Sequence, residues 1–303
     1  MRKILVPTDF TANASRALDF AVQIAKKVKA EIILLHTCCG LIENTSKDNR
    51  IMYNEYNHAF IEQANEKLSS LKEQIEETEK LFVKTKLYKG PVTDTILQAS
   101  EEHHADLIVL GILHETGLTE KIFGSRATVI MDRTNVPVIF VNPLKEWNIP
   151  RKIFIAVNHF EELPVVNNLV FKLAELFNTT VHIAIFTDTD YEIRYEYLRN
   201  ERNISLYKEK LENRYRNISI KTTLLYGQSF QDTIAEYIRE HRIDLVAMIT
   251  HKQTFTESIF NRCAVKKMYY QTQIPLMVIP MQTNYSLSNE ISKNENKYSN
   301  AWL

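Results

Sequence analysis

The chain repeats itself, and this repeat constrains the fold more than any other feature of the sequence. Four short segments of the first half recur in the same order, each 138 positions later: Asp94-Thr95-Ile96, Glu102-His103, Asp106-Leu107 and Pro137. The opening Arg2-Lys3-Ile4 also returns as Arg151-Lys152-Ile153, 149 positions later. A repeat of this length predicts two copies of one domain rather than a single larger unit.

The repeat predicts the domain boundaries. We expect a first domain over residues 1–142, a linker over 143–150 and a second domain over 151–281, which together suit a chain of 303 residues. Residues 282–303 are rich in Asn, Ser, Lys and Glu and hold few apolar side chains. This composition predicts a disordered tail.

Within each half, short apolar runs alternate with longer amphipathic stretches. The expected strands of the first half are 4–8, 31–37, 81–87, 105–111 and 136–141, and its helices are 13–29, 49–80, 92–103 and 124–133. The second half repeats this with strands 152–157, 180–186, 220–225, 244–250 and 276–280 and helices 165–177, 191–215, 230–239 and 257–270. Strands that are apolar on both faces and alternate with helices indicate a parallel sheet covered on both sides. The predicted fold is therefore α/β, with two tandem doubly wound domains, each a five-stranded, mostly parallel sheet.

The composition of the chain bears on whether it binds nucleic acid or a membrane, and on where in the cell it is found. Lys plus Arg and Asp plus Glu both number 37, so a dedicated nucleic-acid binder is not expected. No run approaches the ~20 apolar residues that cross a bilayer, and the opening lacks the pattern of a signal peptide. Three cysteines do not make a disulfide framework. We expect no membrane partner and a cytoplasmic location.

Candidate binding residues lie where predicted strands end. The first strand ends at Pro7-Thr8-Asp9 and the fourth at Leu110-Gly111, and ligands of doubly wound sheets bind at these carboxyl ends. Gly124-Ser125 then opens a helix whose free N–H groups suit a phosphate. Asp9 would accept hydrogen bonds from a ribose or hold a metal ion. A glycine and a serine are also an ordinary helix start, so the pattern alone leaves both readings open.

These residues resemble the universal stress protein family in its tandem two-domain form. The resemblance lies in Ile4-Leu5-Val6-Pro7-Thr8-Asp9, in Leu34-Leu35-His36, in the run from Ala105 to Gly111, and in the spacing from Gly111 to Gly124-Ser125. The family's nucleotide-binding members have a glycine, two residues, a second glycine, nine residues, and then glycine with serine or threonine. Here His114 stands at the second glycine. The resemblance implies an adenine-nucleotide alpha-hydrolase-like fold.

The resemblance also implies contacts to ATP or AMP, with Mg²⁺ as a further candidate ligand. The adenine and ribose contacts fall on Pro7, Thr8, Asp9, Thr37, Leu110 and Gly111, and the phosphate contacts on Gly124, Ser125 and Arg126. His114 departs from the pattern, because its side chain either obstructs a triphosphate or donates a hydrogen bond to it.

The second half has lost this pattern. Asn158 stands where Asp9 stands, Ile249 replaces Gly111, and Asn261-Arg262 replace Gly124-Ser125. We therefore expect the second half to be a structural partner without nucleotide. The final strands 136–141 and 276–280 are expected to meet inside one chain as an intramolecular pseudo-dimer. A homodimer of intact chains through helix faces is left open.

Three functions fit this sequence. The first is a stress-response protein that binds an adenine nucleotide and acts as a sensor or regulator. The second is a structural or partner-binding protein of the same fold that binds no nucleotide. The third is a slow ATPase or nucleotidyl-transfer enzyme, for which Asp9 with Mg²⁺ is the only evident group. We assign no catalytic residue. We also assign no resident metal, because no second cluster of ligands accompanies His36, Cys38 and Cys39.

Overall fold

A computed structural model describes residues 1–38, 50–112, 125–142, 148–157, 163–188, 194–250 and 274–280. The first half contains β1 (Lys3–Pro7), α1 (Ala12–Val28), β2 (Glu31–Cys38), α2 (Arg50–Glu79), β3 (Val83–Lys89), α3 (Val92–Glu102), β4 (Leu107–Gly111), α4 (Ser125–Arg133) and β5 (Val138–Val141). The second half contains β6 (Lys152–Val157), α5 (Leu163–Phe177), β7 (Thr180–Asp188), α6 (Arg194–Arg214), β8 (Ile220–Gly227), α7 (Phe230–His241), β9 (Leu245–Thr250) and β10 (Leu276–Pro280).

The ten strands form one continuous sheet in the order β3-β2-β1-β4-β5-β10-β9-β6-β7-β8. Neighbouring strands are parallel within each half, and β5 and β10 pair antiparallel, with Met277 opposite Ile139. The order 3-2-1-4-5 of the first half is thus repeated by 8-7-6-9-10 in the second. This confirms the doubly wound α/β prediction and the expected meeting of the two final strands within one chain.

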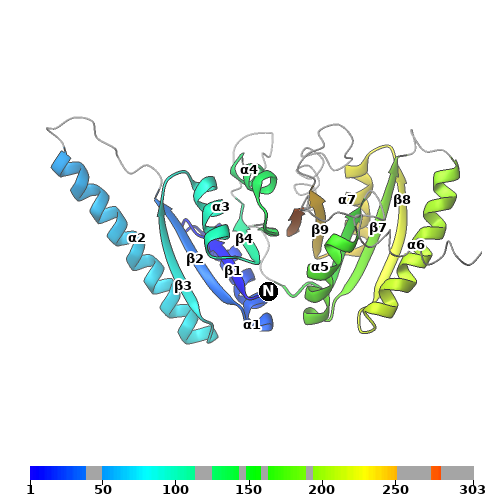
Figure 1. Cartoon of the computed structure of the whole chain (residues 1–303), viewed down its shortest axis with the longest axis horizontal. Coiled ribbons are helices and arrows are strands. Elements are labelled where there is room, and N and C mark those ends of the chain that lie inside the picture. The colour runs from blue at the N-terminus through cyan, green and yellow to red at the C-terminus, as the bar shows by residue number, and fades with distance from the viewer. Residues whose placement is uncertain are drawn as a thin grey trace, which may run out of the picture.

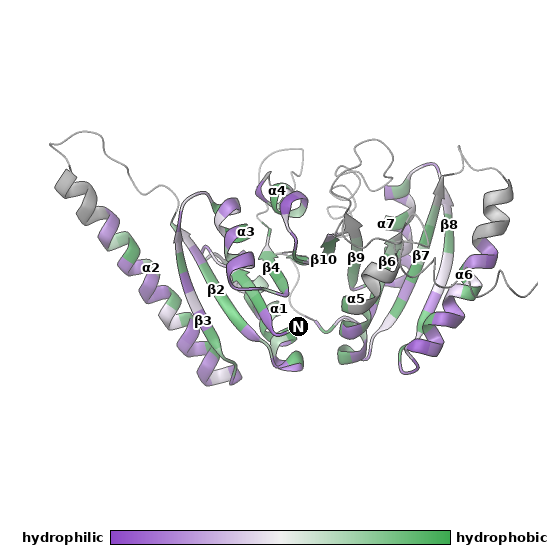
Figure 2. Ribbon diagram, viewed as in Figure 1, coloured by the Kyte–Doolittle hydropathy of each residue, from purple (hydrophilic) through white to green (hydrophobic). Residues whose placement is uncertain are grey.

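Helices cover both faces of the sheet (Figure 1). One buried cluster joins α1, α2, α5 and α6 to the strands, through residues such as Ala17, Leu68, Phe171 and Leu211. A second cluster on the opposite face includes Ile96 of α3, Ile130 of α4 and Ile234 of α7. Figure 2 shows inner strands such as β2 and β4 largely hydrophobic and the outer helix α2 largely hydrophilic, which is the pattern of a sheet buried between two helical layers.

The duplication extends to individual hydrogen bonds. Asp106 Oδ2 accepts the backbone N–H groups of Arg2 at 2.5 Å and Lys3 at 3.0 Å, just where β1 begins. Asp244 accepts the same pair of bonds at the start of β6, at 2.9 and 3.0 Å. The recurring Asp-Leu pair of the sequence therefore ties the start of one strand to the start of its neighbour in both halves.

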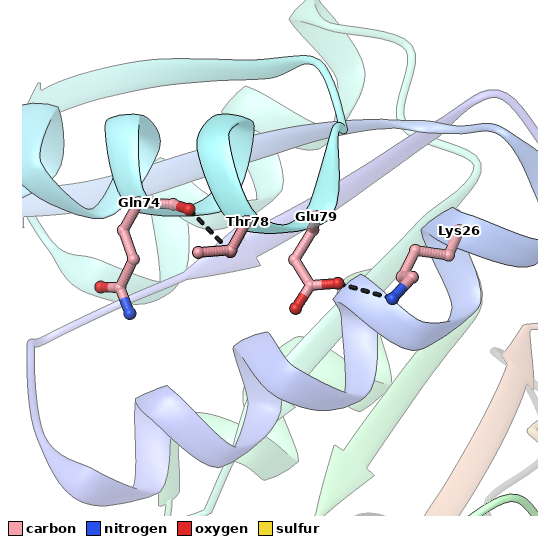
Figure 3. Close-up of polar contacts among 4 residues, drawn as sticks. All are labelled: Lys26, Gln74, Thr78 and Glu79. Atoms are coloured by element: carbon pink, nitrogen blue, oxygen red, sulfur yellow. Dashed lines mark hydrogen bonds and ion pairs between the residues drawn. The ribbon is translucent and has the colours of Figure 1, made fainter.

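The long helix α2 is anchored at its C-terminal end (Figure 3). Glu79, its last residue, pairs with Lys26 in the last turn of α1, with the oxygen and nitrogen 2.6 Å apart. Thr78 Oγ1 donates to the carbonyl oxygen of Gln74 at 2.7 Å, inside the same final turns. Glu76 Oε1 also accepts the backbone N–H of Val83 at 3.0 Å. These contacts fix the end of α2 against α1 and β3.

Most predicted elements start and end within two residues of their observed bounds. The strands β3, β4 and β5 each begin two residues later than predicted, at Val83, Leu107 and Val138, and the late start of β5 has a local cause. Thr134 Oγ1 bonds the backbone N–H and carbonyl of Val136, which removes that residue from the ladder. The predicted helix 257–270 and the predicted tail 282–303 lie outside the described residues.

Candidate functional site

The expected site lies where the connections reverse direction. β1 pairs with β4 in parallel, with Ile4 opposite Leu107 and Leu5 opposite Ile108, so their carboxyl ends adjoin. From β1 the chain proceeds to β2 and β3 on one side, whereas β4 leads to β5 on the other. This is the switch point at which doubly wound sheets open a crevice for ligands. The structure therefore brings Pro7–Asp9 and Leu110–Gly111 together, as predicted.

Thr8 is buried and fixed by three hydrogen bonds. Its N–H donates to the carbonyl of Leu35 at 2.8 Å, and its Oγ1 accepts the N–H of Phe10 at 3.0 Å. His36 Nδ1 lies 2.8 Å from the carbonyl oxygen of Thr8. Because a carbonyl only accepts, Nδ1 of His36 carries the proton. The backbone that leads into the site is therefore rigid, and His36 contributes to that rigidity rather than to a metal site.

Asp9 is exposed, and one of its carboxylate oxygens is committed to the fold. Oδ1 accepts the N–H of Thr11 at 3.0 Å and its hydroxyl at 2.5 Å. Thr11 is in turn the N-cap of α1 and accepts the N–H of Ala14 at 3.4 Å. Both bonds to Asp9 use Oδ1, so within the described part of the chain Oδ2 is left for a further donor such as a ribose hydroxyl.

Gly111 has a structural reason to be glycine. A Cβ atom on it would lie 2.3 Å from the carbonyl oxygen of Asn13 and 2.7 Å from its carbonyl carbon. The end of β4 therefore touches the first turn of α1 backbone to backbone. The sequence motif alone did not identify Asn13, and the contact means that Gly111 is required by packing whether or not a ligand binds.

Phe10 is a further residue that sequence reasoning missed. Its φ is 63°, a left-handed conformation that a bulky residue adopts at a cost of about 1–3 kcal/mol. The Phe10 and His36 ring centroids lie 4.6 Å apart, and Lys67 Nζ of α2 lies 5.4 Å from the Phe10 ring centroid. Strained backbone is often found at binding sites. Through Lys67, α2 also places a positive charge beside Phe10.

The remaining predicted contacts have different local settings. Thr37 and Thr95 hydroxyls lie 2.8 Å apart, and since Thr95 donates to the carbonyl of Val92 at 3.0 Å, Thr37 is the donor between them. The Leu110 side chain is buried in the core. Arg126 is exposed in the first turn of α4, which begins at Ser125. His114, Gly124 and the Ser125 side chain lie outside the described residues, so the phosphate end of the site stays a prediction.

A separate hollow of about 750 Å³ lies between α6 and β8, far along the sheet from this crevice. Its lining consists of Glu201, Arg202, Ile204, Ser205, Thr222, Thr223, Leu224 and Tyr226. Cys38 is buried, as expected for a structural thiol. Among the described residues, no group of three or more His, Cys, Asp or Glu side chains is arranged to hold a metal ion. No helix in the same residues is long and apolar enough to cross a membrane.

These features define a tandem α/β protein of doubly wound type, in which the carboxyl ends of β1 and β4 adjoin at the switch point of the first half. Residues 1–142 match the model of the universal stress protein family. Universal stress protein MJ0577 of Methanocaldococcus jannaschii is 29% identical over 154 residues, which span 46% of this chain and 94% of that protein. Universal stress protein YxiE of Bacillus subtilis is 28% identical over 145 residues, spanning 46% and 97%.

The fold of the whole chain also has solved counterparts. A universal stress protein from Archaeoglobus fulgidus superposes with a TM-score of 0.71 at 15% identity, covering 92% of this chain and 98% of that one. The functionally unknown protein PA1789 from Pseudomonas aeruginosa superposes with a TM-score of 0.58 at 16% identity, covering 92% of both chains. At this identity the likeness establishes the fold, and it extends through the second half.

Proposed function

We propose that this protein acts in a stress response as a sensor or regulator and binds ATP or AMP in its first half. The match of residues 1–142 to the universal stress protein family model supports the stress-response role, and so does the similarity of the chain to named universal stress proteins. The observation that carries the nucleotide proposal is the meeting of Pro7–Asp9 with Leu110–Gly111 at the switch point between β1 and β4. Nucleotides bind sheets of this type in such a crevice.

Each part of the site would contribute a different contact. Asp9 Oδ2 would accept the ribose hydroxyls, because Thr11 holds the carboxylate through the other oxygen. The backbone of Thr37 and of Leu110 would contact the adenine. The start of α4, where Gly124 and Ser125 stand, would hold the phosphates through backbone N–H groups and the helix dipole.

A regulatory role fits this donor set better than fast catalysis. Asp9 is the one group assigned to Mg²⁺, which favours carboxylate oxygens and usually completes its shell with phosphate and water. Its Oδ1 is already bonded to Thr11. Asp9 would thus position a nucleotide and its metal, while a separate group to activate water is not assigned.

Isothermal titration calorimetry of the intact chain with ATP and AMP tests this function. Gly124→Val would block the approach of phosphate to the start of α4 and is expected to abolish the binding heat. Asn261→Val changes the matched position of the second half and serves as the control, with binding unchanged. Wild-type protein that gives no heat with millimolar ATP or AMP would refute the proposal.

The same experiment decides a second candidate, a partner-binding protein of this fold without nucleotide. The observation that favours it is that Gly111 and Asp9 already serve the fold, through the contacts to Asn13 and Thr11. Their presence therefore does not require a ligand. Absence of binding with an intact sheet would favour this function.

A further inference from the structure

Three aromatic side chains of the second half form a polar cluster beneath α7. His182 of β7 is fully buried, and its Nδ1 lies 2.9 Å from the hydroxyl of Tyr237 on α7. His241, the last residue of α7, stacks on Tyr237 with ring centroids 3.9 Å apart and donates from Nδ1 to the Tyr237 carbonyl at 3.1 Å. The His182 and His241 ring centroids are 5.7 Å apart. Tyr237 thus links α7 to the sheet through a histidine.

His182 is held in its neutral form by these surroundings. Its Nε2 is buried and has no hydrogen-bond partner within the described residues. A protonated ring would carry a positive charge and an N–H on both nitrogens, and the N–H at Nε2 would have no acceptor among the described residues, which is unfavourable. Burial is the main cause that lowers the pKa of His182 to about 4, and the charges of Lys221, His241 and Lys152 add to it.

The positive charges near the His182 ring lie on the three elements packed around it, β6, β8 and α7. Lys221 lies opposite His182 on β8, and Phe154 lies opposite it on β6, two residues after Lys152. Lys152 Nζ donates to the carbonyl of His241 at 2.5 Å, which places an ammonium group beside the end of α7. These positive neighbours disfavour both a metal cation and a proton on the closed ring.

The fold itself does not require this cluster. In the first half the residue at the position of His182 is Ile33, which lies opposite Leu5 as His182 lies opposite Phe154. The residue at the position of Tyr237, 138 positions earlier, is Ala99. Both Ile33 and Ala99 are buried and apolar. The same sheet and helix thus pack with apolar residues at these two positions, so the buried histidine beneath the helix is particular to the second half. The first half has a histidine–tyrosine contact elsewhere, between His103 at the end of α3 and Tyr88 of β3, with Nε2 and the hydroxyl 3.2 Å apart.

We propose that His182, Tyr237 and His241 form an acid-sensitive latch, which holds α7 on the sheet at neutral pH and loosens it in acid. When α7 opens, water reaches His182 and the ring gains a proton at its ordinary pKa of about 6.5. The closed form resists that proton down to the lowered pKa. The latch is therefore fully stabilising above about pH 6.5 and weakens progressively as the pH falls toward 4. The second half, which lacks the nucleotide pattern, would respond to acid.

Hydrogen exchange of the intact chain, read by mass spectrometry and corrected for the intrinsic exchange rate, tests the latch. Between pH 7 and pH 5 the two pKa values predict a rise of about twenty-fold in the opening of α7. Peptides from α1, a helix of the first half that contains no histidine, provide the internal reference and are expected to change little. An equal change in α1 and α7 would overturn the proposal.

Two variants and one direct titration complete the test. His182→Ile introduces the residue of the matched position and is expected to remove the pH response of α7. His104→Asn changes an exposed histidine of the first half and should leave the response intact. If His182→Ile does not fold, titration of the His182 ring in the wild-type chain by nuclear magnetic resonance decides the question. A titration midpoint below pH 5 supports the latch, and a midpoint above pH 6 overturns it.

Discussion

Gly111 at the end of β4 lies against Asn13 in the first turn of α1, so closely that a methyl group on Gly111 would lie 2.3 Å from the Asn13 carbonyl oxygen. Backbone cannot move aside as a side chain can. We therefore expect Gly111→Ala to lower the free energy of unfolding by about 1–3 kcal/mol, the usual range for overpacking. Urea unfolding followed by circular dichroism measures this change.

Gly227 offers the matched control for that variant. A methyl group there would also come within 2.3 Å of an atom, but the atom is the hydroxyl oxygen of Thr233, which can rotate away. Gly227→Ala should therefore be less destabilising than Gly111→Ala. Equal losses in the two variants would mean that the close approach of β4 to α1 is not rigid.

The junction between β5 and β10 predicts the effect of a buried charge. Met277 and its neighbour across the ladder, Ile139, are both fully buried. Met277→Lys would place an unpaired ammonium at the centre of the sheet and is expected to destabilise the chain by more than about 4 kcal/mol or to cause precipitation. Phe82→Lys, at an exposed position before β3, is the control and should be tolerated. Thermal unfolding compares the two, and a stable Met277→Lys protein would contradict the pairing.

Asp106 predicts a pH dependence of stability. Burial alone would raise the pKa of Asp106, but hydrogen bonds from the Arg2 and Lys3 N–H groups outweigh it and hold the pKa below its usual value. The carboxylate therefore stabilises the fold above about pH 4, the unfolded value, and this contribution is lost as the pH falls through the lower folded value. We expect Asp106→Asn to lower the free energy of unfolding by about 1 kcal/mol at pH 7. At pH 2 the wild type and the variant are expected to differ less. A constant difference at both pH values would contradict this account.

His114 predicts a selective effect on nucleotide length. This residue stands where the nucleotide-binding pattern has glycine, and a smaller residue leaves more room for phosphate. We expect His114→Gly to tighten ATP binding more than AMP binding by calorimetry, because the additional phosphates extend toward that segment. Weaker binding of the variant, together with wild-type affinity that falls above pH ~6.5, would instead identify His114 as a donor. Equal affinities across pH would exclude both effects.

The repeat and the alternation of strands and helices were sufficient to predict most of the fold. Parallel strands buried on both faces are continuous apolar runs, so their positions could be predicted from those runs in the sequence. The start of β5 was predicted less accurately because the Thr134 side chain bonds the backbone of Val136 just before that strand. Such local competition is not visible in a hydrophobic pattern.

The candidate site was predictable only where it follows from topology. Carboxyl ends of adjoining parallel strands meet, so Asp9 and Gly111 could be placed together in advance. The contact of Gly111 with Asn13 and the bond between Thr37 and Thr95 depend on packing between segments far apart in the chain. The left-handed Phe10 was missed because nothing in its residue type favours that backbone conformation.

The antiparallel pairing of β5 with β10 also has a consequence for assembly by mass action. The strands that complete the ten-stranded sheet belong to one chain, and only a short segment separates Val141 at the end of β5 from Lys152 at the start of β6. A short tether gives the second partner an effective local concentration in the millimolar range. Dilution that would dissociate two separate subunits thus leaves this sheet intact. The fraction of assembled molecules is therefore independent of how much protein is made.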